Sequence, residues 1–184
     1  MQAVPEVKKL GDISLVCVGT PSNENGSLGL GQVERVVAQI GELLRNVDKF
    51  HVVVIRSTVL PGTVQNVIQP LLEQTSRKKD GKNFGICMNP EFMRETTAIH
   101  DFHHPPFTVI SARDDRSFER VAAMYSSVKS PVERTSILVA ELIKYASNAF
   151  HALKVSFANE IGISARLWAL IATKLWRFFA KIPS

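Results

Sequence analysis

Hydrophobic and polar positions alternate along the chain in blocks that change period. Short, continuously apolar runs predict strands, and stretches with apolar residues three to four positions apart predict amphipathic helices. The predicted strands are 13–18, 51–55, 84–88 and 107–110, with an extended piece at 131–134. The predicted helices are 32–45, 61–74, 114–126 and a long one from about 136. Strands that are apolar on both faces and alternate with helices indicate an α/β fold with a parallel sheet.

Polar segments follow the first three predicted strands. They are Val18-Gly-Thr-Pro-Ser, Arg56-Ser-Thr-Val-Leu-Pro-Gly-Thr and Asn89-Pro-Glu-Phe-Met-Arg-Glu. Each segment alone is typical of an ordinary turn, because Gly, Pro, Asn and Ser are turn formers. In open α/β sheets, however, ligands bind in the crevice beyond the carboxyl ends of the strands. Three such segments in series therefore predict a binding site at that edge.

The long helix carries a polar stripe. Lys144, Asn148 and His151 fall at i, i+4 and i+7, which places them on one helical face, and Asn159 returns close to it. Apolar residues surround the stripe, so we expect the helix to be mostly buried. An ammonium, a carboxamide and an imidazole on a buried helix form a donor array for a developing oxyanion and a polar substrate. The alternative is the solvated face of an amphipathic helix.

Composition narrows the class of protein. The 184 residues are 45% hydrophobic and 21% charged, as expected of a globular domain with its own core. The net charge of +5 is compatible with a nucleic acid, a membrane surface or a phosphorylated small molecule as partner. No arginine-rich tract, zinc-ligand spacing or aromatic–basic interleaving is present, so we expect neither a nucleic-acid partner nor a metal. Cys17 and Cys87 lie in apolar runs without C-x-x-C spacing and are predicted to be buried, reduced residues of a cytoplasmic protein. We find no signal peptide and no apolar run long enough to span a bilayer.

The polar segments, taken in order, resemble a known family. Val18-Gly-Thr-Pro-Ser, Ser57-Thr-Val-Leu-Pro-Gly-Thr, Asn89-Pro-Glu-Phe-Met-Arg-Glu-Thr-Thr-Ala-Ile and Glu141-Leu-Ile-Lys-Tyr-Ala-Ser-Asn-Ala-Phe-His are similar to motifs of the UDP-glucose/GDP-mannose dehydrogenases. The resemblance covers roughly 13–162. The Leu60-Pro-Gly turn, the His151-Ala-Leu-Lys run and Phe157-Ala-Asn-Glu-Ile-Gly favour the GDP-mannose 6-dehydrogenase branch. The resemblance implies a partial Rossmann-type parallel sheet followed by a long interdomain helix.

The family oxidises the sugar C6 hydroxymethyl group to a carboxylate in two hydride transfers to NAD, and a thiolate holds the intermediates. The resemblance thus implies oxidation of GDP-mannose to GDP-mannuronate. It places Thr20 near the cofactor and Thr58 beside the cofactor or a catalytic water. It implies that Glu95 takes part in hydrolysing the thioester. It also implies that Lys144 and Asn148 stabilise the oxyanion at C6.

The same resemblance implies a nucleotide-sugar site. Its residues are Glu95, Lys144, Asn148, His151 and Asn159. We expect Lys144, Asn148 and His151 to converge on the loops that bear Thr58 and Glu95. Lys144 should lie near a carboxylate there, with Glu95 the best candidate, because a buried ammonium without a partner is costly.

The chain also departs from the family pattern. The family begins with a strand and a G-x-G-x-x-G turn that cradles the pyrophosphate, and the chain is expected to start after that point. The glycine-rich stretch 26–31 precedes a helix, so it does not match this fingerprint. The nucleophilic cysteine of the family lies in a later Gly-Gly-Ser-Cys motif, and Cys87 lies within a strand without an adjacent base. The chain is therefore expected to be the middle of a longer enzyme or, alternatively, a catalytically dead remnant that binds a sugar nucleotide or dimerises.

Two segments are expected on this basis. Residues 1–134 correspond to the C-terminal part of the NAD-binding domain, and 135–184 to the long helix, which in the family builds a homo-oligomer, and a divergent tail. After Gly162 the tail shows basic residues on one helical side and apolar ones on the other. We favour a helix packed on its own domain or an unselected tail after a truncated or frame-shifted reading frame. A membrane interface or a partner's groove is the less favoured alternative.

Overall fold

The computed structural model describes residues 8–94, 96–168 and 177. The chain divides into two units, 1–145 and 146–184, and each is described by itself. The first unit contains β1 (Ile13–Val16), α1 (Gly31–Leu44), β2 (His51–Ile55), η1 (Val64–Ile68), α2 (Gln69–Ser76), β3 (Phe84–Met88), α3 (Ala98–His103), β4 (Thr108–Ala112), α4 (Asp115–Ala123) and β5 (Val132–Arg134). The long helix α5 (Ile137–Leu167) begins in the first unit and continues into the second.

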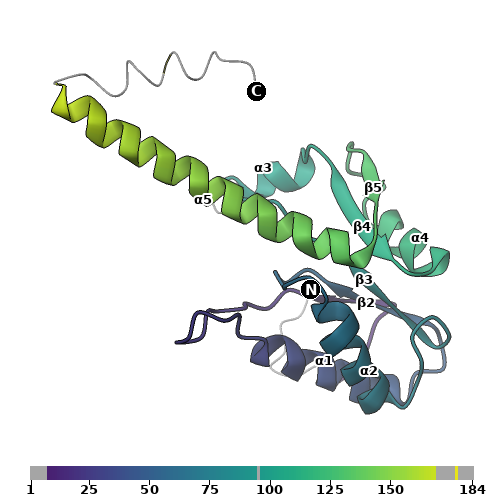
Figure 1. Cartoon of the computed structure of the whole chain (residues 1–184). Coiled ribbons are helices and arrows are strands. Elements are labelled where there is room, and N and C mark those ends of the chain that lie inside the picture. Colours follow the sequence, from purple (N-terminus) through teal and green to yellow (C-terminus); the bar gives the residue numbers. More distant parts are fainter. Residues whose placement is uncertain (1–7, 95, 169–176, 178–184) are drawn as a thin grey trace. The chain divides into compact units, whose positions relative to one another are not determined.

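The sheet has the strand order β1-β2-β3-β4-β5. Figure 1 labels β2 to β5 of this sheet. Strands β1, β2 and β3 are parallel, as are β4 and β5, which confirms the α/β fold. The sheet is mainly parallel and departs from that arrangement at one place, where β4 runs antiparallel to β3. The segment between them contains only the six-residue helix α3 and makes no full crossover, so the chain returns to the sheet in the opposite direction.

Strand β2 is buried on both faces and separates two apolar clusters. Val53 and Ile55 pack with α1 and α2, which lie together on one side of the sheet in Figure 1. Val52 and Val54 pack on the opposite face with Val121 of α4. This alternation follows from the period of two in a strand. Two-sided burial explains why β2 and β3 are continuous apolar runs in the sequence and why their predicted bounds match the observed ones.

Two expectations about burial are wrong. Helix α5 is not mostly buried: Leu142, Phe150 and Leu153 are 54%, 61% and 64% exposed. Apolar residues surround the whole helix, but the residues that the structure describes cover little more than the face with Ala140 and Lys144. Cys17 is exposed, because it follows the end of β1, a strand at the sheet edge.

Cys87 is buried, as predicted. Burial raises the pKa of the Cys87 thiol to about 12, so it stays protonated and unreactive at neutral pH. No helix in the described part of the chain is long and apolar enough to cross a membrane. The basic residues of the tail beyond Arg166, apart from Arg177, lie outside the described residues.

Candidate functional site

The loops after β1 and β2 are hydrogen-bonded to each other. The Thr20 hydroxyl donates to the Thr58 carbonyl oxygen at 2.9 Å. The Ser57 hydroxyl donates to the Val18 carbonyl oxygen at 2.7 Å. Because β1 and β2 are parallel, both loops leave the sheet at the same edge, and these bonds fix their relative position. The predicted meeting of the polar segments at that edge is therefore confirmed for the first two.

A second set of bonds joins the loop after β2 to the loop after β3. One guanidinium nitrogen of Arg56 donates to the Asn89 side-chain oxygen and to the Tyr125 hydroxyl oxygen, each at 2.5 Å. The Asn89 side-chain nitrogen donates to the Val109 carbonyl oxygen at 2.7 Å. Asn89 is buried and uses both the oxygen and the nitrogen of its carboxamide. It therefore holds the start of the loop after β3, called the third loop, against β4.

Lys144 lies against the third loop. Its Nζ donates to Oε1 of Glu91 at 3.0 Å and lies 5.6 Å from the centre of the Phe92 ring. The other Glu91 oxygen accepts the Met93 amide at 2.7 Å. The Lys144 side chain is 7% exposed, so the carboxylate offsets much of the cost of burying its charge. The expectation that Lys144 pairs with a carboxylate of this loop is confirmed with Glu91, whereas Glu95 lies outside the described residues.

Glu141, one turn before Lys144 on α5, is fully buried. Its two carboxylate oxygens accept the amides of Gly62 and Val64, at 2.7 Å and 2.8 Å. These amides belong to the turn that begins η1, where backbone N–H groups have no partner within the helix and favour a negative charge. Helix α5 is thus attached to the second loop by Glu141 and to the third loop by Lys144.

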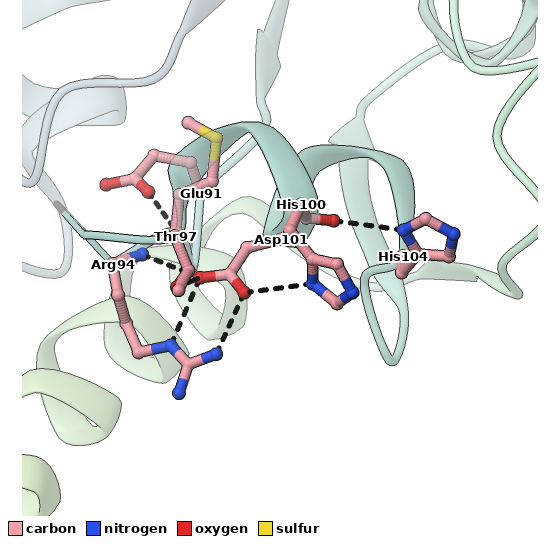
Figure 2. A network of polar contacts seen from close by, with 7 residues as sticks. Glu91, Arg94, Thr97, His100, Asp101 and His104 are labelled. Atoms are coloured by element: carbon pink, nitrogen blue, oxygen red, sulfur yellow. Dashed lines mark hydrogen bonds and ion pairs between the residues drawn. The ribbon is translucent and has the colours of Figure 1, made fainter.

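The segment after the third loop is fixed around Asp101. Figure 2 shows its carboxylate accepting hydrogen bonds from the Arg94 guanidinium, the Arg94 amide and the Thr97 hydroxyl, over 2.8–3.1 Å. The Arg94 hydrogen bonds hold the pKa of Asp101 well below its usual range. Asp101 therefore stays ionised and closes the segment that carries α3 onto the end of the third loop.

A cavity of about 350 Å³ lies between the third loop and this segment. Its wall includes the aromatic side chains of Phe92, Phe102, Phe107 and Tyr125, and Arg56 supplies a positive charge. A volume of this size is within the range of small-molecule sites. The cavity adjoins Glu91, so ligand-sized space lies beside the Lys144–Glu91 pair.

The remaining predicted residues lie in the second unit. Asn148, His151 and Asn159 are exposed on α5 within 146–184. Their approach to Thr58 and Lys144 stays a prediction. Thr20 and Thr58 are half-buried in the first unit and, as described, lie side by side.

Sequence reasoning missed several residues of this edge. Glu141 carried a usable signal, because it lies at i−3 from Lys144 and extends the polar stripe by one turn. Glu91 lies in the motif that begins at Asn89, but the sequence pattern alone did not assign it a function. Tyr125 gave no signal, since it reaches Asn89 from beyond the end of α4, far along the sequence.

Known proteins match the chain across both units. The NAD binding domain of the UDP-glucose/GDP-mannose dehydrogenase family matches residues 2–129, and the central domain of that family matches residues 138–173. GDP-mannose 6-dehydrogenase of Pseudomonas putida is 51% identical over 161 residues, which are 88% of this chain and 37% of that protein. UDP-glucose 6-dehydrogenase of Haloferax volcanii is 41% identical over 82% of this chain and 36% of its own length.

Solved structures agree with these matches. A ternary complex of GDP-mannose dehydrogenase from Pseudomonas aeruginosa has a TM-score of 0.90 and 46% identity, covering 93% of this chain and 39% of that one. UDP-glucose dehydrogenase from Pyrobaculum islandicum has a TM-score of 0.86 and 35% identity, covering 92% and 39%. The chain thus spans less than two fifths of the length of these relatives. Since the NAD-binding-domain match alone covers well over half of the chain, the chain belongs to the UDP-glucose/GDP-mannose dehydrogenase family.

Proposed function

We propose that the chain is part of an NAD-dependent nucleotide-sugar 6-dehydrogenase that oxidises GDP-mannose to GDP-mannuronate at C6. The observation that carries this proposal is the ion pair of the buried Lys144 with the half-buried Glu91, at the edge where three loops follow parallel strands. A fixed ammonium at such an edge is suited to an oxygen that becomes negative during reaction. The identity of about half to GDP-mannose 6-dehydrogenases favours GDP-mannose over UDP-glucose.

The first two loops fit part of the cofactor. Thr20 and Thr58 lie side by side where open α/β sheets bind ligands, and their hydroxyls suit the hydroxyl and amide groups of NAD. NAD, when bound, takes up the hydride. Thr20 donates its proton to the Thr58 carbonyl and keeps its oxygen lone pairs for a ligand donor. Thr58, in the loop after β2, is also the residue that we propose to hold the catalytic water.

The polar stripe of α5 supplies the substrate contacts in this proposal. Lys144 and Asn148 donate to the oxyanion at C6, and Glu91 keeps the Lys144 ammonium oriented. Glu95 takes part in hydrolysis of the thioester and contacts the sugar. His151 and Asn159 bind the nucleotide sugar further along the helix. We place the activity in the cytoplasm, which agrees with two free cysteines in the described residues.

Binding tests the proposal on the chain itself. In calorimetric titration, GDP-mannose should bind the 184-residue chain, and UDP-glucose should bind more weakly. Lys144→Met should weaken GDP-mannose binding roughly tenfold or more, because a charge-assisted hydrogen bond is lost. Lys129→Met, which removes an exposed charge of the first unit, is the matched control and should leave binding unchanged. Equal affinities of the wild type and Lys144→Met for GDP-mannose contradict the site assignment.

A second proposal is that α5 is a dimerisation helix. The observation in its favour is the exposure of large apolar side chains on α5, of which Leu142, Phe150 and Leu153 are more than half exposed. Apolar surfaces of this kind mark protein–protein contacts. The partner is then a second copy of this chain.

A further inference from the structure

Glu141 is a fully buried carboxylate that the proposed chemistry does not use. We propose that Glu141 is a positioning residue, which holds the loop carrying Thr58 in fixed register with the helix carrying Lys144. The inference rests on the proposed function only in assigning Thr58 and Lys144 to the reaction. The register itself is a property of the chain without ligand.

The contact is specific to one turn of the second loop. Glu141 uses one oxygen for Gly62 and the other for Val64, so the two bonds span the residue between them. Gly62 has a φ of +90°, a backbone conformation that favours glycine and directs its amide toward the carboxylate. Thr63 inside this span is buried, and its amide donates to the Leu60 carbonyl. The carboxylate therefore determines the shape of the turn as well as its position.

The same helix carries the second attachment. Lys144 follows Glu141 by three residues, so the two side chains lie on one face about 4.5 Å apart along the helix axis. Glu141 contacts the loop after β2, and Lys144 contacts the loop after β3. One turn of a rigid helix thus sets the distance between two loops that each carry predicted site residues. Sites of this kind lose efficiency when their groups shift by about 1 Å.

Thr58 is held from both sides. Its carbonyl accepts the Thr20 hydroxyl bond, and the turn that follows it is bound by Glu141. Loss of the Glu141 bonds releases only the second of these restraints. We therefore expect the turn at 62–64 and the Lys144–Glu91 pair to change together, while the Thr20–Thr58 bond stays.

The test uses the full chain without ligand. Glu141→Gln keeps the size of the side chain but replaces one acceptor with a donor, and Glu141→Asp keeps the charge but is one methylene shorter. In Glu141→Gln, amide hydrogen exchange at Gly62 and Val64 should be roughly tenfold faster. The Lys144 side-chain NMR resonances should shift as well, although Lys144 is unchanged. If Glu141→Gln does not fold, the same measurements on Glu141→Asp decide.

Val37→Ala is the matched control. Val37 is buried in α1, shares the core and makes no hydrogen bond to either loop through its side chain. This variant should lower overall stability but leave exchange at Gly62 and Val64 and the Lys144 resonances as in the wild type. Equal changes in Val37→Ala and Glu141→Gln, or no Lys144 shift in Glu141→Gln, overturn the inference.

A ligand experiment separates this inference from the proposed function. GDP-mannose should bind Glu141→Gln roughly tenfold more weakly than the wild type, with Glu141→Asp between them and Val37→Ala equal to the wild type. If the wild type itself does not bind GDP-mannose, the proposed function fails, and the ligand-free measurements still decide the role of Glu141. If the wild type binds and Glu141→Gln binds equally well, the positioning role fails alone.

Discussion

At the scale of single residues, the candidate site depends on buried polar groups whose partners come from distant parts of the chain. Glu91 and Lys144 are 53 residues apart, and Glu141 and Gly62 are 79 apart. Sequence reasoning found that Lys144 needs a carboxylate, because burial of an ammonium demands one. It favoured Glu95 over Glu91. The two residues lie close together in the sequence, and the path of the loop after β3, which brings Glu91 to Lys144, cannot be predicted from a local pattern.

His51 shows how a buried residue makes stability depend on pH. Its Nδ1 lies 3.1 Å from the Gly11 carbonyl oxygen and its Nε2 lies 3.0 Å from the Ser14 hydroxyl. Nδ1 must donate to the carbonyl oxygen, and in the neutral ring Nε2 then accepts from the Ser14 hydroxyl. Burial lowers the pKa of His51 below its usual 6.5. The unfolded chain therefore binds a proton first as the pH falls.

The expected result is a loss of folding stability below pH 6.5, by at most about 1.4 kcal/mol per pH unit. Stability is complete above that pH and declines as the pH falls toward the folded-state pKa. Urea unfolding between about pH 5 and 8 measures it. His51→Gln should be less stable throughout but should lose this slope, and His103→Gln, an exposed residue, should keep it. A slope that persists in His51→Gln contradicts the assignment.

At the scale of elements, close approach between α1 and α2 explains a glycine within a helix. A side-chain carbon at Gly41 would lie 1.8 Å from the Thr75 hydroxyl and 2.8 Å from the Thr75 Cβ. Gly41 is a poor helix former, so its place in α1 is explained by packing and not by propensity. The two helices can lie side by side on the sheet because this position has no side chain.

Gly41→Ala should therefore destabilise the chain by about 1–3 kcal/mol, through overpacking. The double variant Gly41→Ala/Thr75→Ala should recover part of the lost stability, because the second substitution removes the hydroxyl but keeps Cβ. Gly31→Ala in the same helix meets no atom within 4 Å and should be neutral or slightly stabilising. Chemical denaturation of the four proteins measures the differences, and equal effects of Gly41→Ala and Gly31→Ala would contradict the packing argument.

The sequence pattern predicted individual elements better than their relations. Strands β2 and β3 have the expected bounds because each is a β-branched or apolar run limited by polar residues. Helix α3 was missed, since its six residues are not buried and show no helical period. The direction of β4 depends on the path of 89–107, which no local pattern records. Burial of α5 was wrong, because an apolar pattern indicates a need for partners and not where they are.

At the scale of the whole molecule, the exposed apolar residues of α5 predict self-association. Light scattering should give a mass above that of the monomer that rises with concentration. Leu153→Glu should shift the chain toward the monomer, because a charge on an apolar contact must be desolvated on association. Ile99→Glu, at a residue of α3 that is 81% exposed, should have no such effect. A monomeric wild type at high concentration contradicts the proposed dimerisation helix.

The reversal at β4 has an effect on how this edge of the sheet can vary. Met88 pairs with Ser111, so most of β4 projects past the end of β3 beside the third loop. The chain leaves and re-enters the sheet at one edge, and the excursion between these points lines the cavity. Lengthening such an excursion costs little, since loop-closure entropy grows slowly with length. Relatives could therefore reshape the cavity by insertions here while every strand keeps its register.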